Sequence, residues 1–300
     1  MSIALNIKDN GYAFALGAAI IWSGFILVSR LGGTSDLNAF DVIAIRYLSC
    51  SLIVLPFWWF KFRFNLFNVK LITCSLVGGL GFALFTFHGF QLASAAQAAI
   101  LLPGLMPIFI LIFAVWINKE RPSINKLLGI TVITLGVSAL LIPIYLSQSS
   151  ISLGQIYLIL GGLCWSVFSV LVKRWGITPW QATVSLAVIT CLIYLPFYIA
   201  FAPKQISLEL WQDIAIQGIY QGFLATIVQM LFYVRAVQLI GPSSVGSVMA
   251  IVPLVSGVAA IFFFDEPLSI TLISALLLVS LGSLLVHSQF NLKRIKHAIR

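Results

Sequence analysis

The chain has 300 residues, of which 61% are hydrophobic and only 8% are charged, and its mean hydropathy is +1.08. So few charged residues cannot build a water-exposed surface, so the composition excludes a soluble globular protein and predicts an integral membrane protein. The net charge is +9, and the basic residues that produce it are expected at helix ends, next to the headgroups of the lipid bilayer.

Ten apolar runs are long enough to cross a bilayer as helices, since a hydrocarbon core of about 30 Å takes roughly 20 helical residues. The first run lacks a small-residue cleavage site and is expected to be retained, not removed as a signal peptide. All the runs are too long and too evenly apolar for membrane β-strands. The sequence therefore predicts an all-α integral membrane protein with ten transmembrane helices. The predicted spans cover residues 12–31, 40–60, 71–91, 95–117, 125–146, 153–174, 180–201, 212–236, 243–264 and 268–288.

Basic residues are unequally shared between the two sides of the predicted bundle. With a cytoplasmic amino terminus, fourteen of the 17 Lys and Arg residues fall on the cytoplasmic side, two on the outer side and one inside a span. This distribution follows the positive-inside rule, so both termini are predicted to be cytoplasmic. The basic tail, residues 291–300, is interpreted as a topology anchor, and no nucleic-acid partner is expected.

The first half of the chain recurs in the second half. The stretch SLIVLPFW (residues 51–58) resembles CLIYLPFY (residues 191–198), which lies 140 residues later. Other matched positions keep similar offsets, and the drift is what small loop insertions produce. The chain is therefore interpreted as a duplicated five-helix unit. The matched pairs are Trp22 with Trp165 at an offset of 143, and Pro107 with Pro253 and Glu120 with Glu266 at an offset of 146.

Because each unit crosses the membrane an odd number of times, the second unit must begin on the opposite side from the first. We expect two inverted repeats, residues 1–146 and residues 147–300, the latter including the basic tail. Inverted repeats can adopt one packing open to each face, with a substrate site near the midplane between them. Alternating-access transport is the expected function.

Two tracts of the chain resemble a known family. The first is SAAQAAILLPGLMPIFILIFAVWINKERPSINKLLGITVITLGV, and the second, whose matched positions lie 146 residues later, is GPSSVGSVMAIVPLVSGVAAIFFFDEPLSITLISALLLVSLGSL. With their mid-helix proline, terminal Glu and glycine-bearing last helix, they resemble the two EamA-type domains of the drug/metabolite transporter superfamily. The resemblance implies a ten-helix carrier of the bacterial inner membrane, most often an exporter of amino acids or other metabolites, and it leaves the substrate open.

Trp22 and Trp165 are the first candidate substrate residues. Both lie in the middle of equivalent spans, far from the interfaces where membrane tryptophans usually lie. Their rings can form the wall of a cavity and offer apolar or stacking contacts to a substrate; core packing is the alternative. Pro107 and Pro253 remove backbone hydrogen bonds in mid-helix and are candidate hinges, with static kinks as the alternative.

Arg46 is the one Lys or Arg in the interior of a predicted span; the others lie at span ends or in the connections. Placing a guanidinium at the centre of a membrane helix costs about 2.5 to 3.5 kcal/mol on insertion scales, so such a group normally faces a watery cavity and holds a partner. Two functional hypotheses follow: Arg46 meets a substrate carboxylate, or it pairs with Asp41 at an outer gate. The alternative is snorkelling of its side chain to the membrane surface.

Two further spans carry polar candidates. His88, in the third span, is either a packed structural group or a functional one. In the eighth span Gln217, Gln221, Gln229 and Tyr233 follow one another at multiples of four residues, a row that winds about 160° around a helix over four turns. We expect this row to turn inward, where it either bonds substrate or joins neighbouring helices.

Missing groups narrow the function further. None of the eight acidic residues lies in the interior of a predicted span; all lie at span ends or in loops. Carboxylate-based ion coupling is therefore not expected, and facilitated diffusion, exchange or protonation of His88 are left. A single Arg is too few for a phosphorylated substrate. As substrates the sequence favours amino acids or similar small, partly apolar metabolites, with drugs, nucleotide sugars and sugar phosphates as alternatives. A channel is the alternative to a carrier.

Enzyme activity is not expected, because the chain lacks the HExxH, GxSxG and CxxC motifs. The four cysteines are scattered through the spans and are interpreted as small buried apolar residues. No cofactor and no metal site are predicted. The expected partners are the lipid bilayer and a small-molecule substrate, and the sequence leaves the oligomeric state open, a monomer included.

Overall fold

The computed structural model describes residues 2–61, 63–146, 152–240 and 242–287. Within these ranges all regular structure is helical, and ten spans are long and apolar enough to cross a membrane. The predicted tail at residues 291–300 lies outside the described residues, and the predicted repeat boundary after residue 146 falls at the edge of the undescribed segment 147–151.

The structure places the spans within a few residues of the predicted ones, except that the first helix begins at Ser2. Three spans contain more than one helical segment. In chain order the elements are α1 (Ser2–Thr34), α2 (Ala39–Phe60), α3 (Val69–Cys74), η1 (Ser75–Gly81), α4 (Phe82–Leu92), α5 (Ala95–Asn118), α6 (Ile124–Leu146), α7 (Leu153–Arg174), α8 (Pro179–Ala200), η2 (Leu208–Leu210), α9 (Trp211–Gln217), η3 (Gly218–Val228), α10 (Gln229–Ile240), α11 (Pro242–Met249), α12 (Val252–Phe264) and α13 (Ile270–His287).

Large apolar side chains cover the outside of the bundle. Phe60, Phe262 and Ile270 are 85%, 77% and 87% exposed, and many other aliphatic and aromatic residues of the described part are similarly uncovered. A continuous apolar surface of this kind is unstable in water and matches the hydrocarbon core of a bilayer. The protein is therefore a multi-pass membrane protein.

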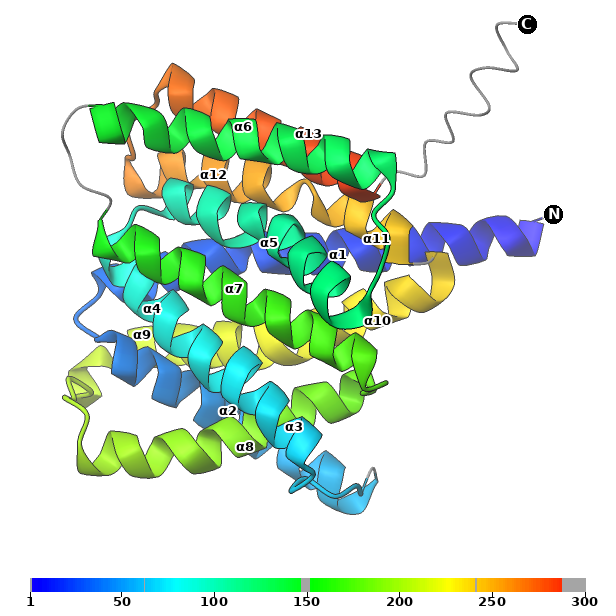
Figure 1. The fold of residues 1–300 in the computed structure, drawn as a ribbon. Coiled ribbons are helices and arrows are strands. Elements are labelled where there is room, and N and C mark those ends of the chain that lie inside the picture. The colour runs from blue at the N-terminus through cyan, green and yellow to red at the C-terminus, as the bar shows by residue number, and fades with distance from the viewer. Residues whose placement is uncertain (1, 62, 147–151, 241, 288–300) are drawn as a thin grey trace, which may run out of the picture.

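Equivalent helices of the two halves run in opposite directions (Figure 1). The face at which α1 begins and α13 ends is called the terminal face, and the other is called the far face. α1 runs from the terminal face to the far face, whereas α7, its equivalent in the second half, runs from the far face to the terminal face. The connections from α1 to α2, from α4 to α5 and from α12 to α13 all lie on the far face.

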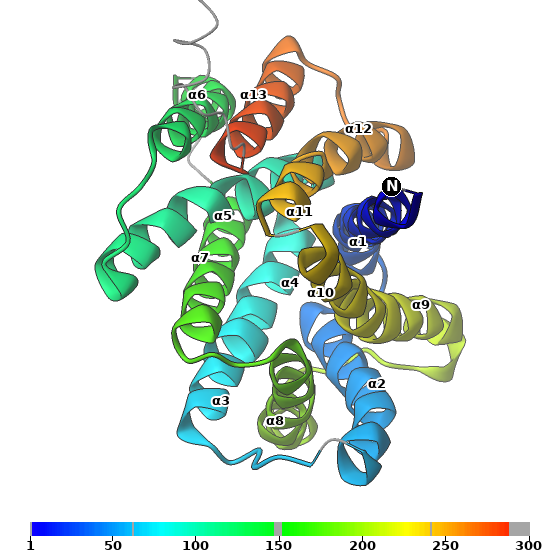
Figure 2. The ribbon, with the colours of Figure 1, turned by 90° about the vertical axis from the view of Figure 1, so that its right-hand side faces the viewer.

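The packing of the helices follows the same internal symmetry (Figure 2). α6 lies against α13 at one end of the bundle, and α2 lies against α8 at the other. On the two flanks α1 packs against α10, and its equivalent α7 packs against α4. α5 contacts both α7 and α12 between these layers. Each half thus supplies one member of each packed pair.

The third and eighth spans, which are equivalent, both contain a π-helical segment, η1 and η3. In a π-helix each backbone amide bonds to the carbonyl five residues earlier, which widens the turn and shifts the faces of the helix that follows. η3 therefore divides the polar row predicted for the eighth span: Gln217 and Gln221 bond to α1 and α2, whereas Gln229 and Tyr233 line a cavity.

The two predicted hinge prolines lie in different local structures. α5 is one uninterrupted helix through Pro107, whereas the chain leaves the helical path at residues 250–251, between α11 and α12, directly before Pro253. Pro253 lies in the first turn of α12, where its missing N–H leaves no bond unmade. Equivalent positions thus have two backbone conformations within one molecule, and a hinge role for the pair stays a prediction.

Candidate functional site

A cavity of about 890 Å³ lies between the two halves and reaches the terminal face. It is lined by residues of α1, α5 and α6 from the first half and of α7, α8 and α10 to α13 from the second. On α7 the lining residues run inward from Lys173, whose side chain is 71% exposed, to Trp165. The cavity therefore opens on the terminal face and ends near the middle of the bundle.

Trp22 and Trp165 meet at the inner end of this cavity. Their ring centroids lie 6.0 Å apart with an interplanar angle of 67°, an edge-to-face contact, and both side chains line the cavity and are half-buried. Trp165 also lies 5.0 Å from the ring of Phe82 and 5.1 Å from that of Phe168. Two residues 143 positions apart thus form one aromatic floor with a polar indole N–H on each half.

Four other predicted residues share this cavity. Gln229 and Tyr233 lie on α10, one turn apart, and Pro107 and Pro253 lie on α5 and α12. Six of the eight candidate residues predicted from the sequence therefore lie around one cavity. Their part in binding a substrate or in hinge motion stays a prediction.

Arg46 lies outside the cavity, toward the far face. Its side chain is 5% exposed, and its Nη1 donates a hydrogen bond of 2.9 Å to Oε1 of Gln221. The Nε2 of Gln221 in turn donates to the hydroxyl of Ser29 at 3.0 Å. The guanidinium carbon lies 5.4 Å from the ring centroid of Phe25 and 5.8 Å from that of Phe87.

The predicted outer-gate pair of Arg46 with Asp41 is not present among the described residues. Asp41 is fully buried, and its carboxylate accepts hydrogen bonds from the hydroxyl of Tyr198 at 2.5 Å and from the backbone amides of Asn38 and Gln205, both at 3.1 Å. The five-residue spacing puts Asp41 and Arg46 on different sides of α2. Asp41 instead joins the start of α2 to the end of α8.

His88 also lies outside the cavity. Its Nδ1 lies 2.7 Å from the carbonyl oxygen of Leu84, four residues earlier in the same helix. Its ring lies edge-on against Phe40 at 4.7 Å and Tyr157 at 6.1 Å. These contacts describe a packed, hydrogen-bonded histidine that joins α4 to α2 and α7.

The far face is closed by contacts between the halves. Both carboxylate oxygens of Glu266 accept hydrogen bonds from the first amides of α5, at 2.6 Å from Ala95 and 2.9 Å from Ala96. A negative charge at a helix N-terminus is favourable, because it pairs with unbonded N–H groups and with the helix dipole. Beside it, Nη1 of Arg30 donates to the carbonyl oxygen of Phe90 at 2.6 Å, at the end of α4.

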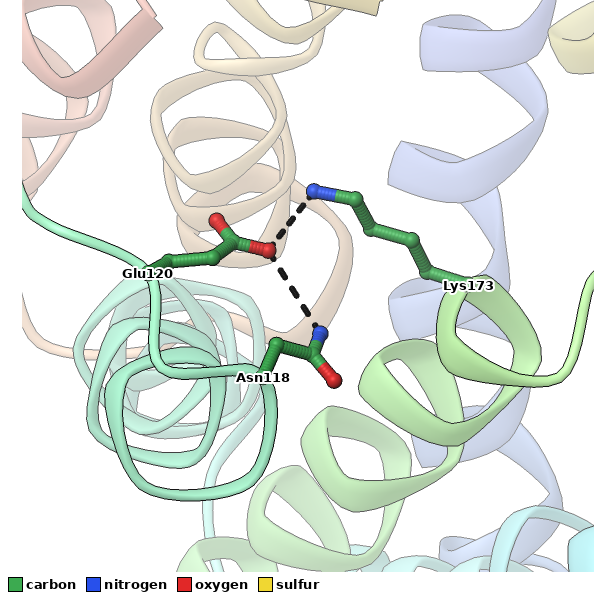
Figure 3. Close-up of polar contacts among 3 residues, drawn as sticks. All are labelled: Asn118, Glu120 and Lys173. Atoms are coloured by element: carbon green, nitrogen blue, oxygen red, sulfur yellow. Dashed lines mark hydrogen bonds and ion pairs between the residues drawn. The ribbon is translucent and has the colours of Figure 1, made fainter.

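On the terminal face Glu120, the equivalent of Glu266, has different partners (Figure 3). Its Oε1 lies 2.7 Å from Nζ of Lys173 and accepts a 3.4 Å hydrogen bond from Asn118. The hydrogen bond from Lys173 is the main reason why the pKa of the Glu120 carboxyl is below its usual value. Both Glu120 and Lys173 line the mouth of the cavity.

The glutamates were recognised in the sequence as repeat marks but not as site residues. Each follows a residue in the left-handed backbone region, Lys119 with φ 58° and Asp265 with φ 49°, so the chain leaves α5 and α12 in the same way. The signal that could have found them is their shared offset, since a charged residue repeated at two helix ends suggests a repeated contact.

Two oppositely directed five-helix halves around a central cavity define a transport protein of the membrane. A family model describes the same arrangement in sequence terms, matching residues 9–142 and residues 152–288 separately. The chain belongs to the EamA-like transporter family, as the two tracts of its sequence indicated.

Individual relatives agree with this assignment. The chain is 26% identical over 226 residues to the uncharacterized transporter YyaM of Bacillus subtilis (strain 168), covering 72% of each chain. It is 24% identical over 265 residues to an uncharacterized transporter of Archaeoglobus fulgidus, covering 86% of this chain and 89% of the relative. A solved crystal structure with 19% identity matches 92% of this chain and 96% of its own with a TM-score of 0.61, which shows a shared fold.

Proposed function

We propose that the protein is an alternating-access transporter of amino acids or similar small, partly apolar metabolites, which bind at Trp22 and Trp165. The observation that carries this proposal is the meeting of these two equivalent tryptophans at the inner end of the cavity. A site on the symmetry axis of two inverted repeats stays in place while the halves move around it. It can therefore be reached from either face in turn.

Glu266 and Glu120 supply the contacts that alternate. In this conformation Glu266 caps α5 and closes the far face, while Glu120 bonds to Lys173 beside the open mouth. Exchanging the conformations of the two repeats gives the reciprocal state. In that state Glu266 releases α5, the far face opens, and Glu120 moves from Lys173 to the start of α11, which together with α12 is the equivalent of α5.

The substrate is suited to the chemistry of the cavity. Charged side chains line it only near the terminal face, namely Glu120, Lys126 and Lys173. Deeper in, Met106, Phe168 and the tryptophan pair provide apolar and aromatic walls, and Gln229 supplies an amide. Such a pocket favours a solute with an uncharged, apolar part that stacks on the indoles.

The distribution of Lys and Arg favours a cytoplasmic terminal face, and the resemblance to EamA-type carriers favours the inner membrane of a bacterium. The cavity then opens to the cytoplasm, where it loads metabolites made inside the cell. Export or exchange is the corresponding direction of net transport.

Counterflow in proteoliposomes tests the proposal. Vesicles loaded with unlabelled L-phenylalanine are diluted into a trace of labelled L-phenylalanine, with L-leucine, L-lysine and L-glutamate tested in the same way. A carrier accumulates label transiently and saturates. Label entering at a rate unaffected by the inside solute would indicate a pore, and no entry of any amino acid would refute the proposed substrate class.

A further inference from the structure

Arg46 is a buried cation that the open cavity does not use. Arg46 is 5% exposed, its Nε has no hydrogen-bond partner, and the polar side chains that its guanidinium contacts, the amide of Gln221 and the phenol of Tyr47, are neutral. A cation in this environment is costly unless it is paired with an anion. Nearby rings offset part of that cost by cation–π contact, but they supply no negative charge.

Aromatic rings separate Arg46 from the floor of the cavity. The Phe25 ring lies 5.4 Å from the guanidinium carbon and 6.3 Å from Phe82, and Phe82 lies 5.0 Å from Trp165. Arg46 therefore lies behind the tryptophan pair, on the line from the cavity to the far face. A route to the far face that opened between these rings would pass the guanidinium.

The internal symmetry shows what the reciprocal conformation exposes. Phe25 is equivalent to Phe168 at the offset of 143 that relates the tryptophans, and Phe87 is equivalent to Tyr233 at the offset of 146. Phe168 and Tyr233 line the open cavity, whereas Phe25 and Phe87 are buried against Arg46. When the repeats exchange conformations, Phe25 and Phe87 become the cavity wall. Leu186, the equivalent of Arg46, packs behind Phe168, and the longer side chain of Arg46 brings its guanidinium to both rings of the new wall.

We infer that Arg46 binds the carboxylate of the substrate when the far face is open. The equivalent position is Leu186, which is buried and does not line the open cavity, so that cavity has no such cation and the carboxylate site exists in one of the two states alone. A guanidinium binds a carboxylate by two parallel N–H donors, and Arg46 has the unbonded Nε for one of them. The inference rests on the proposed transport function and narrows its substrates to monocarboxylates with an apolar side chain.

Matched probes test the chemistry of this site. Counterflow of labelled L-phenylalanine is competed with unlabelled L-phenylalanine or with phenethylamine, which keeps the ring and lacks the carboxylate. In the wild-type protein, unlabelled L-phenylalanine is expected to inhibit counterflow at a concentration at least tenfold lower than phenethylamine. Arg46→Gln should lose at least tenfold of that preference, Arg46→Lys should keep part of it, and Arg63→Gln, at an exposed residue outside the pathway, should keep all of it.

A second measurement needs no known substrate. Arg46→Cys is made in a background free of the native cysteines, with and without Glu266→Gln, and an anionic, membrane-impermeant thiol reagent is added from the far face. Labelling at least tenfold faster with Glu266→Gln supports the inference. No labelling in either background, while Asp36→Cys on the exposed far-face connection reacts, would overturn it.

The outcomes separate the two proposals. If Arg46→Gln prefers L-phenylalanine over phenethylamine as strongly as the wild type does, the role of Arg46 is overturned and the proposed transport function stands. Failure of every amino acid in counterflow removes the proposed substrates, and the labelling of Arg46→Cys then decides whether the residue faces the reciprocal cavity.

Discussion

Glu266 accepts hydrogen bonds from the amides of Ala95 and Ala96 at 2.6 and 2.9 Å, whereas its equivalent, Glu120, lies 2.7 Å from Nζ of Lys173. Two identical side chains, 146 residues apart and held by the same left-handed backbone turn, thus have unlike partners on opposite faces. The difference follows the state of each face, since the first closes the far face and the second borders the open cavity.

Removing the charge of Glu266 should open the far face. Glu266→Gln loses a charge-assisted cap, a contact worth about 1.5 to 3 kcal/mol, so the balance between the two states should shift by about tenfold or more. The reporter is Ser169→Cys, a half-buried cavity position, in a background without native cysteines. Its labelling by a thiol reagent from the terminal face should slow.

Glu209→Gln is the matched control, since Glu209 is an exposed far-face glutamate. It should leave the labelling unchanged. Equal effects of Glu266→Gln and Glu209→Gln would show that the cap on α5 does not hold the far face closed.

The ion pair of Glu120 with Lys173 should depend on pH. Because the pKa of Glu120 is lowered from its usual value, about 4.3, by the bond from Lys173, the stabilisation is complete above that value. It is lost as the pH falls through the lowered pKa. Lys173 is 71% exposed, so the pair contributes less than about 1 kcal/mol. The melting temperature of Glu120→Gln should lie slightly below that of the wild type at pH 7, and the difference should shrink as the pH falls through the lowered pKa; a difference that does not shrink in acid would mean that another contact is responsible.

The tryptophan floor should be needed for transport more than for folding. Trp22→Ala and Trp165→Ala remove half-buried rings that face the cavity, so folded protein should be recovered while counterflow per folded molecule falls at least tenfold. Trp22→Phe and Trp165→Phe should restore part of the activity, because a ring is kept. The control is Trp116→Ala, which removes a 69% exposed ring from α5. Equal losses of folded protein and transport would assign the pair a packing role.

Asp41 should act through stability alone. Its buried carboxylate accepts three hydrogen bonds, one from the N-cap of α2, one from Tyr198 in α8 and one from Gln205 after α8, and a hydrogen bond to a charged group contributes about 1.5 to 3 kcal/mol. Asp41→Ala should lower the free energy of unfolding in detergent by at least that amount, and Tyr198→Phe by less. In a double-mutant cycle the two changes should not add. Strict additivity would contradict a direct bond.

Much of the fold could be predicted from the sequence, because its strongest signals are long apolar runs and residues that recur at similar spacings along the chain. Ten apolar runs of sufficient length predict the spans, and the similar offsets between Trp22 and Trp165 and between Glu120 and Glu266 indicate the repeats. The π-helical segments were not predicted. Gly78 and Gly79 in η1 suggest close packing, but the backbone pattern there depends on neighbours, such as the 2.9 Å bond from the Tyr47 hydroxyl to the Gly79 carbonyl.

The site was only partly accessible for a similar reason. The depth of a tryptophan or proline in the membrane follows directly from its position along a predicted span. The side to which Arg46 or His88 points depends on the rotation of α2 and α4 against their neighbours, and these helices are apolar almost all round. Without a polar stripe, periodicity cannot orient them.

The central claim is that the two faces open alternately, and paired distances across each face test it most directly. Spin labels are placed at the exposed residues Asp36 and Pro267 on the far face and, in a second protein, at their equivalents Pro179 and Arg121 on the terminal face. Introducing Glu266→Gln should lengthen the first distance and shorten the second. Two distances that stay fixed, or that change in the same direction, would contradict alternating access.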